Sequence, residues 1–268
     1  MRALLKVGFS LLMLAFVLIG LSYAALRANG VAAASEGRQV SSEKREVPAA
    51  IKAIDLDGPI DLNVRYGAAP SLEVRGEARL LNNVDVNADG EVLHIGLRGM
   101  VLGHRRPLQV ELVLPRLDSV KIDGSGDSSV NGFSGERIEA RMQGSGSLRF
   151  NGRFRQVDAA LSGSGELDLN AGPSIERFDA VLTGSGHLTI VGGTRELHAN
   201  ASGSGELDAR HLRAEKVEVS QTGSGRSTVH ARHSVAASIS GSGDIEVTGN
   251  PAERSVSRSG SGSVTFSE

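Results

Sequence analysis

The sequence predicts an all-β protein whose second half is a parallel β-helix, a solenoid of stacked coils. Two observations lead to this prediction: the tripeptide Gly-Ser-Gly recurs eight times at a nearly constant interval, and the residues on both sides of it alternate between apolar and polar. Composition excludes other classes, because the 268 residues include 34 Gly, neither Cys nor Trp, and a formal net charge of −2. Disulfides, thiolate metal sites and nucleic-acid binding are therefore not expected.

Residues 1–34 are predicted to be a signal peptide or an N-terminal membrane anchor. Arg2 and Lys6 precede an uncharged run, residues 7–26, and a basic start before an apolar stretch is typical of an export signal. Small-residue cleavage sites are present, but the run also approaches the ~20 residues that span a bilayer, so cleavage and a membrane tether both remain open. Either alternative predicts an exported protein of the periplasm or the cell surface.

The remaining chain is expected to be a linker, residues 35–47, followed by one β-helical domain, residues 48–268. Its first part, residues 48–115, consists of short period-two runs separated by turn residues, and Asn-Ala-Asp-Gly at 87–90 is typical of a hairpin turn. These leading strands are expected to extend or cap the solenoid. No amphipathic helix is expected after residue 35.

The repeats, residues 116–268, define the coils. Gly-Ser-Gly begins at residues 124, 144, 163, 184, 203, 223, 241 and 260, a mean spacing of 19.4 residues. Six, four and two residues before each first Gly, and four and six residues after it, the chain is mostly apolar, which predicts two inward-facing strands per coil. The position four before is nearly always Ala, which indicates a narrow interior. About eight coils at ~4.8 Å would form a rod of roughly 38 Å.

Gly-Ser-Gly is interpreted as a structural corner, because glycine tolerates positive φ and close backbone approach where every coil must turn. The serines are expected to stack as a column. No Lys-Ser/Thr and no helix follow the tripeptide, so it is not a phosphate-binding loop. The corner residues are Gly124, Gly126, Gly144, Gly146, Gly163, Gly165, Gly184, Gly186, Gly203, Gly205, Gly223, Gly225, Gly241, Gly243, Gly260 and Gly262.

Two outward columns carry charge. One follows the corner directly and contains Asp127, Ser147, Glu166, His187, Glu206, Arg226, Asp244 and Ser263; the other contains Glu139, Asp158, Asp179, His198 and Glu218. The three successive carboxylates of the second column raise the alternative of a weakly bound divalent cation, but a solvated charged face is favoured. We therefore predict no catalytic, cofactor-binding or metal-binding residue.

The last coil departs from the pattern, since Arg254, Val256 and Arg258 stand where earlier coils place apolar residues. Terminal repeats of a solenoid need a polar end, so this coil is expected to be a cap. The final strand, residues 263–266, still leaves an unpaired edge.

The leading strands, the segment LPRLDSVKIDGSGDSSV at 114–130 and the repeated Gly-Ser-Gly units resemble the GIN-domain family of bacterial envelope proteins. The resemblance covers about 220 residues. The resemblance implies an exported, right-handed β-helix. The family is provisionally described as an adhesin head domain, and it offers no catalytic residues that could be assigned to this chain.

Three function classes follow. The first is a non-enzymatic envelope protein for adhesion or binding of an unidentified envelope or extracellular ligand, with no cofactor. The second is a structural scaffold that self-associates end to end through its strand edges. The third, a polysaccharide-active enzyme, is disfavoured, because aromatics are only 3% of the residues and the acids fall on repetitive columns.

Overall fold

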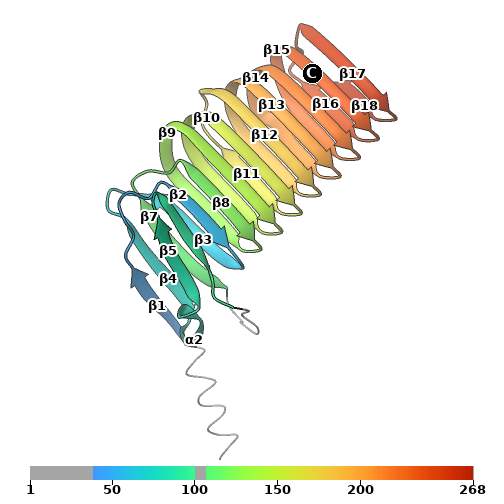
Figure 1. Cartoon of the computed structure of the whole chain (residues 1–268). Coiled ribbons are helices and arrows are strands. Elements are labelled where there is room, and N and C mark those ends of the chain that lie inside the picture. Colours follow the sequence, from blue (N-terminus) through green and yellow to red (C-terminus); the bar gives the residue numbers. More distant parts are fainter. Residues whose placement is uncertain (1–38, 100–106, 268) are drawn as a thin grey trace, which may run out of the picture.

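The computed structural model describes residues 39–99 and 107–267, which form a rod of stacked coils (Figure 1). The all-β prediction is confirmed: the rod is a parallel β-solenoid of about 7 turns. The expected signal or anchor, residues 1–34, lies outside the described residues. Within those described ranges, the structure contains no helix long and apolar enough to cross a bilayer.

The elements follow one another with short connections. In chain order they are β1 (Val40–Arg45), β2 (Ala53–Asp57), β3 (Ile60–Tyr66), β4 (Ser71–Glu77), α2 (Ala78–Leu81), β5 (Val84–Asp89), β6 (Val92–Leu97), β7 (Leu108–Leu114), β8 (Ser119–Gly124), β9 (Asp127–Gly144), β10 (Ser147–Gly163), β11 (Glu166–Asn170), β12 (Ile175–Gly184), β13 (His187–Gly203), β14 (Glu206–Gly223), β15 (Arg226–Gly241), β16 (Asp244–Thr248), β17 (Glu253–Gly260) and β18 (Ser263–Phe266).

The coils stack in the register that the tripeptide spacing predicts. Gly144 pairs with Gly163, Gly163 with Gly184, and Gly184 with Gly203, so equivalent positions of successive coils lie side by side. The long strands, such as β10 and β14, run from one corner around the coil to the next. Two ladders of parallel strands therefore meet at the corner, and they are joined on the opposite side by bends or short loops.

The core is a narrow column of apolar side chains between the two ladders, mostly aliphatic, with Phe150 and Phe178 as its largest fully buried members. Ala140, Ala159 and Ala180 occupy its centre and are 0–2% exposed, as the alternation predicts. The core also contains polar side chains: Ser128 is buried, and in another coil the Ser227 hydroxyl donates to Gln221 Oε1 at 2.6 Å, with both residues buried. This hydrogen bond satisfies groups that would otherwise be costly to bury.

The leading strands enter the stack out of chain order. β2 and β3 pair in parallel with β8 and β9, whereas β6 and β7, which come later in the chain, pair with the outer sides of β2 and β3. The coil formed by β2 and β3 is therefore enclosed between two later coils. Its corner is Gly58-Pro59-Ile60, which begins the corner row one coil before the first Gly-Ser-Gly.

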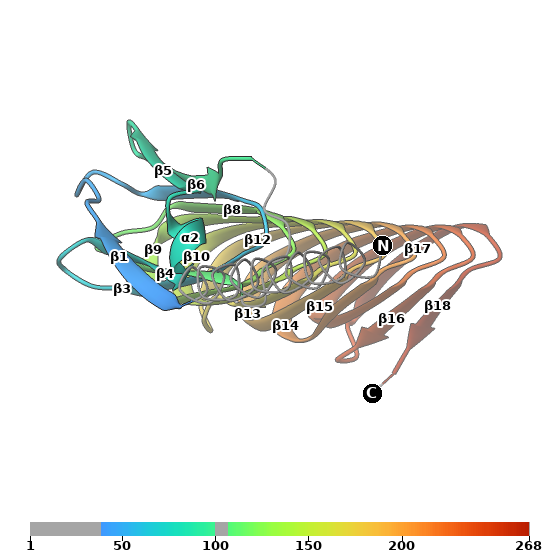
Figure 2. The ribbon, with the colours of Figure 1, turned by 90° about the horizontal axis from the view of Figure 1, so that it is seen from below.

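Antiparallel elements complete the N-terminal end (Figure 2). β4 pairs with β7 and carries β1 at its outer edge, while β5 and β6 form the hairpin predicted at 87–90. The leading strands therefore both extend and cap the solenoid. The single turn α2 buries Leu80 and Leu81, so the expectation of no helix after residue 35 is corrected by these four residues.

Residues 40–45 also correct the expected linker, because they form β1. This strand is attached through its backbone to β4, and nearly all its side chains are exposed. A strand held in this way needs no apolar alternation, which explains why the sequence pattern does not reveal it.

The C-terminal end has no such covering among the described residues. All of β17 is exposed, including Val256 at 48%. The Arg254 guanidinium lies 4.5 Å from the centre of the Phe266 ring, and its Nε donates to the Pro251 carbonyl at 2.9 Å. The arginine thus covers one aromatic ring of the last coil, although the strand edge stays open.

Candidate functional site

The corner row is built by backbone contacts. The N–H groups of Ser145 and Gly146 both donate to the Gly124 carbonyl at 3.1 Å, and the five corners that begin at residues 163, 184, 203, 223 and 241 repeat this arrangement. Gly144 has a φ of +108°, and a Cβ placed there would lie 2.3 Å from the same carbonyl oxygen. Only glycine avoids both the strain and the overlap. The corner is therefore a structural device whose serine side chains point to solvent.

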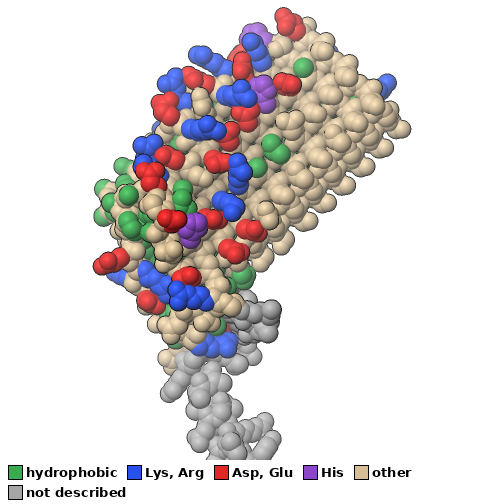
Figure 3. Space-filling view, in the orientation of Figure 1, with side chains coloured by type: hydrophobic (Ala, Val, Ile, Leu, Met, Phe, Trp, Pro, Cys, Tyr) green, Lys and Arg blue, Asp and Glu red, His purple; other side chains and the backbone are tan. Residues whose placement is uncertain are grey.

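The edge of the rod formed by the corners carries no charged side chains along most of its length, as the tan surface on the right of Figure 3 shows. The exposed side chains immediately before and within the corners are hydroxyls from the coil of Gly163 onward. They are Ser162, Ser164, Thr183, Ser185, Ser202, Ser204, Thr222, Ser224, Ser240, Ser242, Ser259 and Ser261.

The column of successive carboxylates is neutralised by arginines. Register places Glu139, Asp158 and Asp179 side by side, as predicted. Arg137 Nε donates to Asp158 at 2.8 Å, and Arg177 Nε donates to Asp179 at 2.6 Å. These ion pairs relieve the repulsion that suggested a cation. In the part of the chain that the structure describes, no group of three or more metal-ligating side chains is found.

The column after the corner is linked by side-chain contacts between coils. The Ser147 hydroxyl donates to Asp127 at 2.6 Å, and a His187 ring nitrogen lies 2.7 Å from Glu206. The predicted alternation of acids and cations thus forms a ladder of cross-strand pairs, which stabilise the stacking of neighbouring strands.

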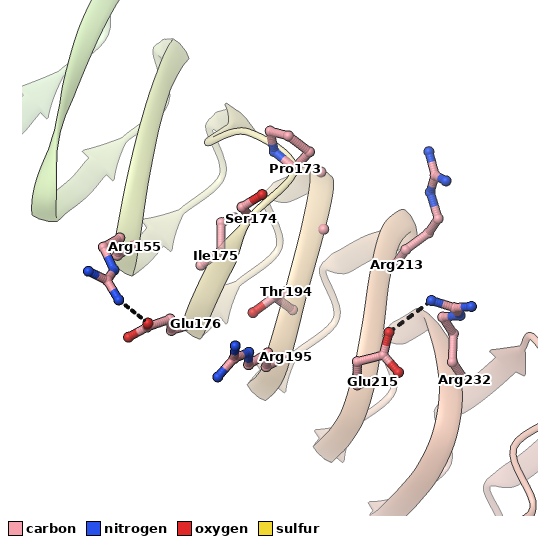
Figure 4. A pocket seen from close by; sticks show the side chains of 12 residues that line it. Arg155, Pro173, Ser174, Ile175, Glu176, Thr194, Arg195, Arg213, Glu215 and Arg232 are labelled. Atoms are coloured by element: carbon pink, nitrogen blue, oxygen red, sulfur yellow. Dashed lines mark hydrogen bonds and ion pairs between the residues drawn. The ribbon is translucent and has the colours of Figure 1, made fainter.

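A groove lies on the side of the coils opposite the corners, and its volume is about 720 Å³ (Figure 4). We call it the arginine groove and define it by Arg155, Glu176, Arg195, Arg213, Glu215 and Arg232. These side chains come from β10, β12, β13, β14 and β15, so the groove runs across five successive layers of the rod.

The hollow exists because side chains are missing where the coil turns. Gly192 and Gly193 line it, and a Cβ on either would lie 2.4 or 2.6 Å from the carbonyl oxygen of Gly172 or Pro173. Register shifts occur on this same side between Thr189 and Val191. The corner does not allow irregular register, so differences between successive coils are accommodated on the groove side.

The four arginines of the groove differ in whether they form ion pairs. Arg155 pairs with Glu176, which keeps the pKa of that carboxyl below its usual range, and Arg232 Nη1 lies 2.9 Å from Glu215 Oε1. Among the described residues, neither Arg195 nor Arg213 has a contact ion pair. Four arginines against two glutamates leave an excess of two positive charges.

His230 follows Arg213 in the next coil and lies at the margin of this region. Desolvation, followed by the charges of Arg232 and Arg213, lowers the pKa of His230 below its usual value. Its Nδ1 lies 3.0 Å from the Thr248 hydroxyl.

Our sequence analysis missed the groove, although a signal for it was present. Eight residues before the first Gly of successive corners stand Glu136, Arg155, Glu176, Arg195 and Glu215, a strict alternation of acid and base. This column lies two residues outside the positions, up to six before the corner, that predict the inward faces. Arg213 and Arg232 lie outside this column and are brought to it by the bends.

Comparison with known proteins gives a family and a fold. The family model described as "Putative auto-transporter adhesin, head GIN domain" matches residues 51–251. A putative adhesin from Parabacteroides merdae has a TM-score of 0.80 at 22% identity, covering 86% of this chain and 97% of that chain. A putative lipid binding protein from Parabacteroides distasonis has the same TM-score and coverage at 24% identity. No curated protein matches the chain.

Proposed function

This chain belongs to the GIN head-domain family of putative auto-transporter adhesins, and from that premise we propose that it is an exported, non-enzymatic binding module of the cell envelope. The observation that carries the proposal is the segregation of charge: one long side of a rigid rod presents ordered ion pairs and the arginine groove, whereas the corner edge presents hydroxyls (Figure 3).

A binding role fits this arrangement better than catalysis. The groove is open, and the side chains of Arg155 and Arg232 are 56% and 57% exposed. Catalytic groups act in sites where burial or neighbouring charge brings a pKa close to the working pH. The groove instead holds arginines, which are charged at any working pH, and Glu176, whose pKa is lowered chiefly by its hydrogen bond from Arg155. Charged groups spread over several coils suit a multivalent contact with an extended partner.

The first experiment is protease treatment of intact cells, with antibodies against residues 35–268 and a periplasmic protein as the control. Digestion while the control is protected is expected for an adhesin, and a deletion strain should then adhere less than the wild type. Digestion only after permeabilisation of the outer membrane would contradict adhesion and favour ligand binding within the periplasm. Recovery of the chain in the cytoplasmic fraction would contradict export.

The second candidate function is a scaffold that self-associates through the C-terminal end. The open edge of β17 and the exposure of Val256 favour it, because unpaired edges add strands. Arg254 and Arg258 stand against it, since like charges at inward positions discourage pairing. Light scattering over a hundredfold range of concentration tests it: growth of the particle with concentration supports a scaffold, and a constant monomer excludes it.

A further inference from the structure

The arginine groove has a charge pattern that selects among polymers. Along Arg155, Glu176, Arg195 and Glu215, an acid follows each base from one layer to the next. Layers are separated by ~4.8 Å, so like charges recur at about 9.6 Å. Along this column, a partner lying on the rod therefore meets a guanidinium at every second layer and a carboxylate between them. Arg213 and Arg232 lie beside the column, in the layer of Glu215 and in the layer after it (Figure 4).

The arginines and the glutamates of the groove bind different chemical groups. A guanidinium donates paired hydrogen bonds to carboxylate, sulfate or phosphate oxygens. A carboxylate such as Glu176 accepts hydrogen bonds and repels anions. The complementary partner therefore alternates acidic groups with hydrogen-bond donors.

We propose that the arginine groove binds an acidic polysaccharide in which charged sugars alternate with neutral ones. Acidic groups of the polymer accept from Arg195 and Arg213, which have no contact ion pair among the described residues, and sugar hydroxyls donate to Glu176 and Glu215. This inference rests on the proposed binding function and names its ligand class.

Other polymers fit less well. A nucleic acid carries a charge on every unit and offers no neutral unit to face the glutamates, and the chain as a whole has a formal net charge of −2. A neutral polysaccharide would leave the arginines unused. Stacking of neutral sugars also needs aromatic faces, and the groove has none among its lining residues.

The test uses the purified full-length chain and immobilised polymers. The probes are hyaluronate, in which a uronic acid alternates with a neutral sugar, polygalacturonate, dextran and double-stranded DNA. We expect hyaluronate to bind best, polygalacturonate more weakly, and dextran not at all. Binding of DNA as tight as that of hyaluronate would overturn the proposal in favour of a general polyanion site.

Two double variants separate the groove from general electrostatics. Arg195→Ser with Arg213→Ser is expected to weaken hyaluronate binding about tenfold or more, because two charge-assisted contacts are lost. Arg149→Ser with Arg226→Ser, on the strands that follow the corner and outside the groove, removes the same charge and should change binding less than about twofold. Equal losses in the two double variants would overturn the proposal.

A third variant should act in the opposite direction. Glu176→Gln keeps an acceptor oxygen but removes one of the two carboxylates, Glu176 and Glu136, with which Arg155 pairs, so hyaluronate should bind about threefold tighter. Weaker binding would contradict the assigned roles. If the wild-type chain binds none of the acidic polymers but cells still adhere through it, the ligand class is wrong and the adhesion role stands. Failure of both assays removes both proposals.

Discussion

The corner edge and the arginine groove lie on opposite sides of the same coils, and they differ in how much variation of sequence and coil length they tolerate. At the corner, the layers from Gly144 to Gly241 repeat the same two backbone hydrogen bonds to one carbonyl. A Cβ on the first glycine of any Gly-Ser-Gly would lie 2.1–2.5 Å from the carbonyl oxygen of the preceding layer. On the groove side, coils of 18 to 21 residues fit into the same stack through bends, glycines and register shifts. The corner therefore fixes the spacing of the layers, and the opposite side is free to carry functional side chains.

The largest effect on stability is expected for a substitution in the core, which the two sides share. Leu182 is 1% exposed, so Leu182→Asp buries an unpaired charge and should cost more than ~4 kcal/mol, unfolding several coils. Val181→Asp is the matched control, since the neighbouring side chain is 42% exposed. Circular dichroism and thermal melting measure both. Retention of the wild-type melting temperature by Leu182→Asp would refute the assignment of the inward face.

The next largest effect is expected at the corner. Gly184 has a φ of +115°, and a Cβ there would lie 2.4 Å from the Gly163 carbonyl oxygen. Gly184→Ala should therefore lower the free energy of unfolding by roughly 2–4 kcal/mol. Ser185→Ala at the same corner should change it by less than ~0.5 kcal/mol, because the hydroxyl is exposed. Urea titration measures both, and similar losses would mean that the hydroxyl column holds the corner together.

The corner was the part of the fold that the sequence made easiest to predict. Because the same sterics act in each layer, Gly-Ser-Gly recurs visibly and sets the register from β8 to β18. The enclosed coil was harder, since Gly58-Pro59-Ile60 makes the same corner with a different tripeptide. Alternation shows that β2 and β6 are strands, but it does not say which of them pairs with β8.

The groove was missed for a different physical reason. Exposed Arg195 and Arg213 need no particular neighbours to be soluble, so nothing local marks them as a site. Their significance arises from register, which brings them beside Glu176 and Glu215, and from glycines that leave a hollow. A charge column is visible only after the coils are aligned, and the position of Arg213 depends on bends that no repeat encodes.

A pH effect is expected on the groove side, because the Gly-Ser-Gly corner itself has no titratable side chain. His230 has a lowered pKa in the folded state, chiefly through desolvation. The unfolded chain therefore binds more protons between the folded pKa and about 6.5, so stability is full above about 6.5 and falls as pH decreases through that window. His230→Gln should reduce the difference in melting temperature between pH 7.5 and pH 5. An unchanged difference would assign the pH dependence to other groups.

The smallest effect is expected in the ladder that follows the corner. Glu206 pairs with His187 at 2.7 Å, but both side chains contact solvent. Glu206→Ser should shift the free energy of unfolding by less than ~0.5 kcal/mol. A loss of several times that size in urea titration would show that these exposed pairs determine the stacking, and the contrast between the two sides would then need revision.

Because of the enclosed coil, the two ends of the rod should respond differently to a pulling force. The C-terminal strands β17 and β18 are each held on one side only, so a pull on that end should unwind the last coil first. Each released coil of about 20 residues would lengthen the chain by roughly 65 Å. A pull from the N-terminal end should first detach β1 from β4. It then meets β2 and β3, which are clamped between β6 and β7 on one side and β8 and β9 on the other. The molecule should therefore yield stepwise from one end while the interleaved coil keeps the other end closed.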